Sequence, residues 1–121
     1  MLGTPLAPSI AKKLRVKGAH LETVALCDVE FISGIRSALL RKELSLARAA
    51  EAIEDYSDLP LRLHPHRPFL ERLWELRNNF TAYDAAYVVL AERLNAALLT
   101  ADERLARSVL SHTSIRLIEI A

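Results

Sequence analysis

Apolar residues recur along the chain at two spacings, and each spacing predicts one kind of secondary structure. Intervals of three and four residues place side chains on one face of a helix, whereas short apolar runs bounded by turn or charged residues are typical of buried strands. The helical spacing predicts helices at residues 29–42, 45–58, 66–79, 82–94 and 102–110. The short runs predict strands at residues 21–27, 61–64, 96–100 and 115–121.

The order of these elements indicates how the strands are connected. Two neighbouring helices lie between the first two predicted strands, and further helices separate the later ones. Strands separated by helices need crossover connections, which favour a parallel sheet covered by helices on both faces. The sequence therefore predicts an α/β fold. We expect a single domain over residues 1–121, because the chain contains no internal repeat and no linker.

Composition and charge narrow the function only slightly. Apolar residues make up 51% of the chain, with three Gly and five Pro, which is the composition of a globular protein. The absence of a long uncharged apolar run and the single Cys27 lead us to expect a soluble protein of the cytoplasm. The net charge of +1 does not by itself indicate a nucleic-acid binder. Residues 1–50 hold eight Lys and Arg against four acids, which suits either a modest basic patch or solvated helix faces.

Two acids, Asp84 and Asp102, each stand where a predicted helix begins. The helix that starts at Asp84 leads away from the carboxyl edge of the sheet, and the strand at 96–100 returns to that edge just before Asp102. Glu30 obeys the same geometry, because we expect it in the first turn of the helix that follows strand 21–27. Three distant carboxylates are therefore predicted at one edge, which in open α/β sheets is where ligands bind.

Carboxylates gathered in this way repel one another unless protons or a cation neutralise them. Oxygen ligands suit a hard divalent ion, Mg²⁺ or Mn²⁺, which lowers the pKa of water and offsets charge that develops on a phosphoryl group. Metal-assisted hydrolysis of a phosphodiester is the function that follows. The alternative is that the acids only cap helices, since Thr81 and Thr100 each begin a loose capping-box pattern. Both interpretations remain open at this point.

Other polar and aromatic residues also have two interpretations. His64 and His66 could bind a metal as a pair, but with no Cys or third His nearby we interpret them as the entry to a helix. Several arginines near the acids could contact phosphates or belong to solvated helix faces. These arginines are Arg36, Arg104 and Arg107.

Three aromatic side chains could stack on unpaired bases. Because they stand at helical spacing among Ala and Leu, we expect them to lie in the core. They are Trp74, Tyr83 and Tyr87.

Two stretches of the sequence resemble a known family. "YDAAYVVLAERLNAALLTADERLARS", residues 83–108, resembles the carboxyl-terminal signature of PIN-domain ribonucleases, in particular the VapC-type toxins of bacterial toxin–antitoxin pairs. "DVEFISGIRSALLRKELS", residues 28–45, resembles the earlier VapC segment in which an acid two residues into the stretch precedes Leu/Arg-rich sequence. The likeness spans roughly residues 20–121, and the later motif is the more specific of the two.

This resemblance implies a PIN-like three-layer α/β/α fold with a central, mostly parallel sheet. It implies an Mg²⁺- or Mn²⁺-dependent endoribonuclease, often dimeric, that a cognate VapB-type antitoxin silences by inserting into the active site. Glu30, Asp84 and Asp102 match three of the family's four acids, and Thr100 matches the hydroxyl residue found before the last. The alternative is a catalytically impaired PIN-like module that binds antitoxin or RNA without cleaving.

The chain departs from the family at its amino-terminal end. The family begins with an apolar strand that ends in the first catalytic Asp, whereas this sequence has no acid before Glu22. Residues 1–15 resemble the end of the first family helix and the turn after it. We therefore expect a misplaced start or a truncated chain, and an upstream coding sequence for a Val/Ile-rich strand that ends in Asp. Because that strand lies at the centre of the family's sheet, its loss should remove ladder hydrogen bonds and core burial.

Overall fold

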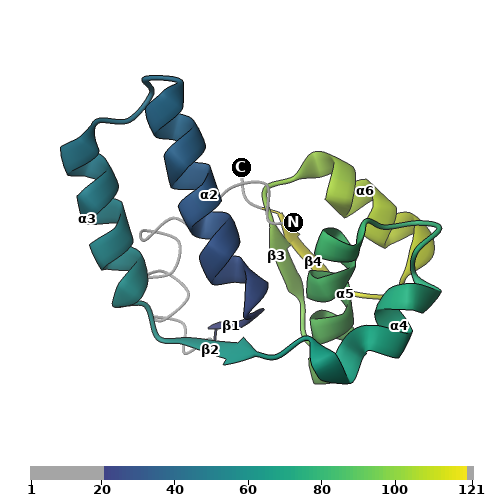
Figure 1. The fold of residues 1–121 in the computed structure, drawn as a ribbon. Coiled ribbons are helices and arrows are strands. Elements are labelled where there is room, and N and C mark those ends of the chain that lie inside the picture. The colour runs from purple at the N-terminus through teal and green to yellow at the C-terminus, as the bar shows by residue number, and fades with distance from the viewer. Residues whose placement is uncertain (1–20, 120–121) are drawn as a thin grey trace.

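A computed structural model describes residues 21–119 of the chain. Helices and parallel strands alternate along this range, which confirms the predicted α/β class (Figure 1). Expectations about the first family strand, and about residues 1–20, lie outside the described residues. The elements are β1 (Leu21–Val24), α2 (Leu26–Leu40), α3 (Leu46–Ser57), β2 (Leu61–His64), the 3-10 helix η1 (Arg67–Phe69), α4 (Leu70–Glu75), α5 (Ala82–Leu94), β3 (Leu98–Thr100), α6 (Glu103–His112) and β4 (Leu117–Glu119).

The strands pair in parallel, as the crossover argument predicts. β1 pairs with β2 from Leu21 opposite Leu61 to Val24 opposite His64. β3 pairs with β4, with Leu98 opposite Leu117. Within residues 21–119 the strands form two two-stranded sheets, and no ladder joins one pair to the other. The parallel arrangement of the expected sheet is thus present, but the described residues divide it into two halves.

Side-chain alternation shows which helices cover each face of the β1–β2 pair. Leu61 and Leu63 point to one face, where they line a space shared with residues of α2 and α3. Val24 points to the opposite face and joins the core cluster that α5 dominates. The pair is therefore sandwiched between the α2–α3 hairpin on one side and α5 on the other, which is a three-layer arrangement (Figure 1).

Helix α5 is the most deeply buried element among the described residues. Eight consecutive residues, from Asp84 to Ala91, are buried. A helix that is apolar on all sides is stable only inside a protein, and α5 contacts β1, β3 and α4. Leu105 and Val109 of α6 join the same core cluster. One helix therefore connects both strand pairs.

Two predicted boundaries are wrong for reasons that lie outside the local sequence. β1 ends at Val24 rather than at residue 27, and α2 begins at Leu26 rather than at residue 29. The early start is stabilised by the His66 ring, whose Nε2 accepts a hydrogen bond from the Leu26 N–H at 3.1 Å.

The predicted helix at 66–79 is divided into η1 and the short α4, which ends at Glu75. Pro68 stands at the start of η1.

Other boundaries agree with the prediction because local signals set them. Helix α5 spans residues 82–94, as the spacing predicts. The Thr81 side chain caps its start, and Asn95 ends it in the left-handed conformation, with φ of 50°. Ser45 caps α3 by accepting a hydrogen bond from the Arg48 N–H at 3.1 Å. No helix within residues 21–119 is long and apolar enough to cross a membrane.

A bidentate ion pair joins α4 to α5. The Arg72 guanidinium donates to the Glu92 carboxylate through Nε at 3.0 Å and Nη2 at 2.9 Å. The hydrogen bonds to Glu92 raise the pKa of Arg72 above its ordinary value, so the guanidinium remains charged. Such bidentate geometry is the strongest form of an arginine–carboxylate contact.

We expect Arg72→Ala to lower the free energy of unfolding by about 1 kcal/mol, because a half-exposed bidentate pair contributes more than an exposed one. Urea denaturation measures this change. Arg41→Ala is the control, since Arg41 pairs with Glu43 in a contact whose two side chains are each 60% exposed. That variant should change stability by only a few tenths of a kcal/mol. Equal losses in the two variants would contradict the assignment.

Candidate active site

Asp84 lies buried in the first turn of α5. Its side chain is 8% exposed, although carboxylates are rarely buried without a partner or a function. The N-cap of α5 is Thr81, whose Oγ1 accepts a hydrogen bond from the Asp84 N–H at 3.1 Å. Thr81 is therefore the N-cap, and Asp84 stands three residues later, as in the capping-box pattern that the sequence predicts. The role of Asp84 as a metal ligand stays a prediction.

Glu30 lies on α2 and is connected to α5 by a hydrogen bond. Because α2 begins at Leu26, Glu30 is in the second turn rather than in the first turn as expected, and Asp28 is the acid of the first turn. The hydroxyl of Tyr87 donates to Oε1 of Glu30. Burial raises the pKa of Tyr87 well above its ordinary value, and the hydrogen bond to Glu30 raises it further. Tyr87 therefore stays protonated and remains a donor at neutral pH.

Asp102 and Thr100 form a local unit between β3 and α6. Asp102 is the N-cap of α6, and its Oδ1 accepts hydrogen bonds from the N–H groups of Arg104 at 3.0 Å and Leu105 at 3.1 Å. Thr100 is 1% exposed, and its Oγ1 accepts a hydrogen bond from the Asp102 N–H at 3.0 Å. The capping interpretation is confirmed here, with Asp102 as the cap in place of Thr100.

The three acids offer the oxygen ligands that Mg²⁺ and Mn²⁺ prefer. Their donor chemistry thus fits a hard divalent ion. In the part of the chain that the structure describes, no group of three or more His, Cys, Asp or Glu side chains is arranged to hold a metal ion. What the structure brings together is Glu30 with Tyr87, three residues beyond Asp84 on the same helix.

The two histidines of the β2–η1 turn have separate partners. His64 Nε2 lies 2.8 Å from Oε1 of Glu22 on the neighbouring strand. His66 precedes η1 and accepts the N–H of Leu26. The interpretation of this segment as a helix entry is confirmed, and His66 has the further role of capping α2.

Two of the three aromatic residues expected in the core are exposed. Trp74 is 67% exposed and Tyr83 is 61% exposed, whereas Tyr87 is 4% exposed. The core interpretation is therefore wrong for Trp74 and Tyr83. Tyr83 directly precedes the buried Asp84. Tyr83 can be exposed because neighbouring residues of a helix lie on different faces. The arginines that could contact phosphates are also exposed, namely Arg36, Arg104 and Arg107.

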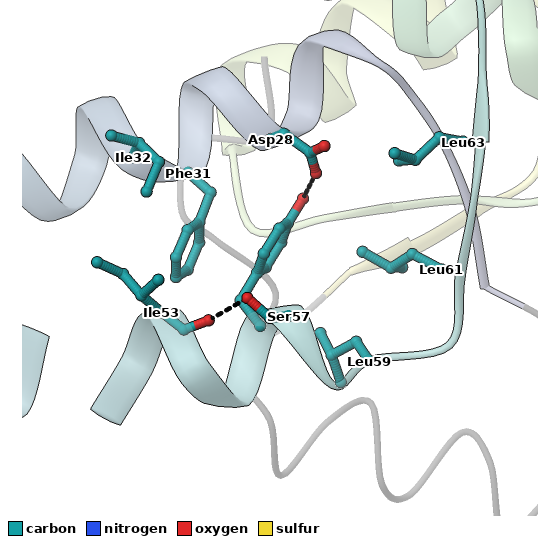
Figure 2. Close-up of a pocket in the computed structure, with 9 residues that line it drawn as sticks. Asp28, Phe31, Ile32, Ile53, Ser57, Leu59, Leu61 and Leu63 are labelled. Carbon is teal, nitrogen blue, oxygen red and sulfur yellow. Dashed lines mark hydrogen bonds between the residues drawn. The ribbon is translucent and has the colours of Figure 1, made fainter. Parts of the chain in front are cut away.

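A pocket of about 350 Å³ lies between α2, α3 and β2 (Figure 2). Its lining is mostly apolar, and Phe31 stacks on Tyr56 with ring centroids 4.1 Å apart. The Tyr56 hydroxyl donates to Oδ1 of Asp28 at 2.8 Å, and burial raises the pKa of Tyr56. None of Glu30, Asp84 and Asp102 lines this pocket. It is therefore separate from the candidate active site.

Comparison with known proteins gives a consistent result. Residues 5–109 match the PIN-domain family. Ribonuclease VapC12 of Mycobacterium tuberculosis is 38% identical to this chain over 118 residues, which cover 98% of this chain and 90% of that protein. Ribonuclease VapC9 of the same organism is 41% identical over 90 residues, covering 74% and 71%. Ribonuclease VapC1 is 38% identical over 106 residues, covering 84% and 80%.

The capping role of Asp102 can be separated from the role of its charge. We expect Asp102→Ala to lower the free energy of unfolding by about 1 kcal/mol, because α6 loses its N-cap acceptor. Asp102→Asn should change it much less, since Asn caps a helix about as well as Asp. Urea denaturation of both variants measures the difference. Equal destabilisation by the two changes would contradict the capping assignment.

Proposed function

The chain belongs to the PIN-domain family and is of VapC type, and on this premise we propose that it is a metal-dependent endoribonuclease toxin that hydrolyses phosphodiester bonds of RNA. The observation that carries the proposal is the buried carboxyl side chain of Asp84, which stands in the first turn of α5 within the stretch that matches the family. The names of the similar proteins, each a ribonuclease, support the same reaction. The stretch that matches the family, residues 5–109, includes all three candidate acids.

Glu30, Asp84 and Asp102 would hold Mg²⁺ or Mn²⁺ in this proposal. When bound, such an ion supplies an activated water and offsets the charge that develops on the phosphate. The protein's own groups then have positioning tasks. Thr100 fixes the backbone of Asp102 through its 3.0 Å hydrogen bond, so that the carboxylate stays at the carboxyl end of β3.

Several exposed side chains suit an RNA substrate. Arg36, Arg104 and Arg107 would contact phosphates, which positions a strand without reading its sequence. Tyr83 and Trp74 present exposed rings on which unpaired bases would stack. Single-stranded RNA is the substrate class that uses both kinds of contact.

A VapB-type antitoxin is the proposed protein partner, and a homodimer in the cytoplasm is the proposed state of the enzyme. Helices α2 and α3 expose large apolar side chains, and exposed apolar surface of this kind is typical of protein-binding surfaces. The side chains are Val29, Ile32, Leu40, Leu46 and Ile53.

The second candidate is a catalytically impaired module that binds antitoxin or RNA without cleaving it. The observation that favours it is that no group of three or more metal ligands is preformed within residues 21–119. Cleavage that depends on a divalent ion distinguishes the two candidates.

We expect the purified protein to cleave single-stranded RNA with Mn²⁺ and to lose this activity when EDTA is added. Asp84→Asn should lower the rate by roughly 100-fold or more, because a metal ion contributes several kcal/mol of charge stabilisation and that variant loses a ligand. Gel analysis of a labelled RNA measures both effects. Asp55→Asn, at an exposed position on α3, is the matched control and should cleave as the parent does.

If Asp84→Asn cleaves as fast as the parent, the proposed site is wrong. RNA or antitoxin binding without chelator-sensitive cleavage would instead support the impaired module.

We expect Tyr83→Ala to weaken the binding of single-stranded RNA by roughly 1–3 kcal/mol, the contribution of one stacked base. Fluorescence anisotropy in the Asp84→Asn background measures affinity without cleavage. Leu110→Ala is the control, because Leu110 is exposed to a similar degree, 65%, but has no aromatic ring. Equal affinity of the two variants would remove Tyr83 from the proposed RNA contacts.

A further inference from the structure

We propose that Tyr87 is a positioning residue of the candidate active site, whose hydroxyl holds the Glu30 carboxylate so that its second oxygen can bind a divalent cation. This inference rests on the proposed function, because it gives Glu30 the role of a metal ligand. It assigns a role in the site to Tyr87, for which the spacing among Ala and Leu indicates only a core position.

Tyr87 contacts one proposed ligand and lies one helical turn from another. Its hydroxyl donates to Oε1 of Glu30 on α2. On its own helix it follows Asp84 by three residues, so the two side chains are neighbours one turn apart. A single rigid helix thus carries one proposed ligand and the hydroxyl group that orients another.

Burial makes Tyr87 suitable for this task. The side chain is 4% exposed and belongs to the core cluster together with Val24 and Cys27. Packing therefore fixes the direction of its hydroxyl. Glu30, by contrast, is only half-buried and has a long side chain that loses rotamer freedom when it is held in place.

The chemistry of the hydrogen bond leaves room for a metal. An ionised carboxylate has two oxygens with several acceptor positions, and one hydroxyl donor occupies only one of them. Carboxylates that bind metal ions are usually hydrogen-bonded in turn, and loss of such an outer partner typically weakens metal binding by about 10- to 100-fold.

The protein contains a matched control for this contact. Tyr56 donates its hydroxyl to Asp28, a second tyrosine–carboxylate hydrogen bond that also ends on α2 (Figure 2). Asp28 is exposed and is not a proposed ligand. Tyr56→Phe and Tyr87→Phe therefore each remove a hydroxyl that donates to an acid of α2, and only Tyr87→Phe changes a contact of the candidate active site.

The test measures Mn²⁺ binding by isothermal titration calorimetry in the parent chain and in both variants. We expect Tyr87→Phe to weaken Mn²⁺ binding by roughly 10- to 100-fold and Tyr56→Phe to leave it unchanged. The Mn²⁺ concentration for half-maximal RNA cleavage should rise by a similar factor in Tyr87→Phe, and cleavage should recover at high Mn²⁺. Loss of core packing alone would not produce recovery by added metal.

Two further measurements separate loss of the hydrogen bond from loss of folding. Phe keeps the ring that fills the core, and urea denaturation checks that Tyr87→Phe and Tyr56→Phe are folded. Glu30→Asp shortens the acidic side chain by one methylene, so that it no longer reaches Tyr87, and should weaken Mn²⁺ binding to a similar degree.

The outcomes separate the two claims. If the parent binds Mn²⁺ and cleaves RNA while Tyr87→Phe behaves like Tyr56→Phe, the role of Tyr87 is overturned and the proposed function stands. If the parent neither binds Mn²⁺ nor cleaves RNA, the proposed function fails and the role of Tyr87 fails with it.

Discussion

The burial of α5 on all its sides is the constraint on which the rest of the structure depends. Both strand pairs and α4 pack against this helix, and eight consecutive residues from Asp84 to Ala91 are buried. A charge is tolerated in such surroundings where hydrogen bonds, a cation or the positive end of a helix offset its loss of water. The first turn is the position on α5 at which that condition is most easily met. The place of Asp84 thus follows from the packing that holds the two halves of the domain together.

The same helix relates the fold to the candidate chemistry. Tyr87 extends from α5 to Glu30, and the Arg72–Glu92 ion pair fixes α5 against α4. Asp102 is held separately, as the cap of α6 at the end of β3. Glu30 and Tyr87, far apart in the sequence, are joined through the buried α5, while Tyr83, next to Asp84, is exposed.

Local signals in the sequence predicted those parts of the fold that local contacts determine. The spacing of apolar residues predicts the helix at 82–94, whose ends Thr81 and Asn95 set, and a short apolar run predicts the strand at 61–64. The start of α2 depends on a His66 ring forty residues away, which spacing cannot reveal. The family motif singles out Glu30, Asp84 and Asp102 as candidates, but it does not show which side chains hold them in place. The apolar spacing indicates only a core position for Tyr87. Such spacing predicts which face of a helix is buried, but it does not predict the hydrogen-bond partner of a hydroxyl group.

The parallel pairing of β1 with β2 has a kinetic consequence. Leu21 meets Leu61 only after the whole α2–α3 hairpin has been spanned, so the chain must close a long loop before the first ladder hydrogen bond forms. Contacts between residues so distant in sequence slow folding, whereas helices form from near neighbours in microseconds or less. We therefore expect the pairing of these two short strands, rather than the formation of any helix, to set the time that a newly made chain spends with its strand edges open to aggregation.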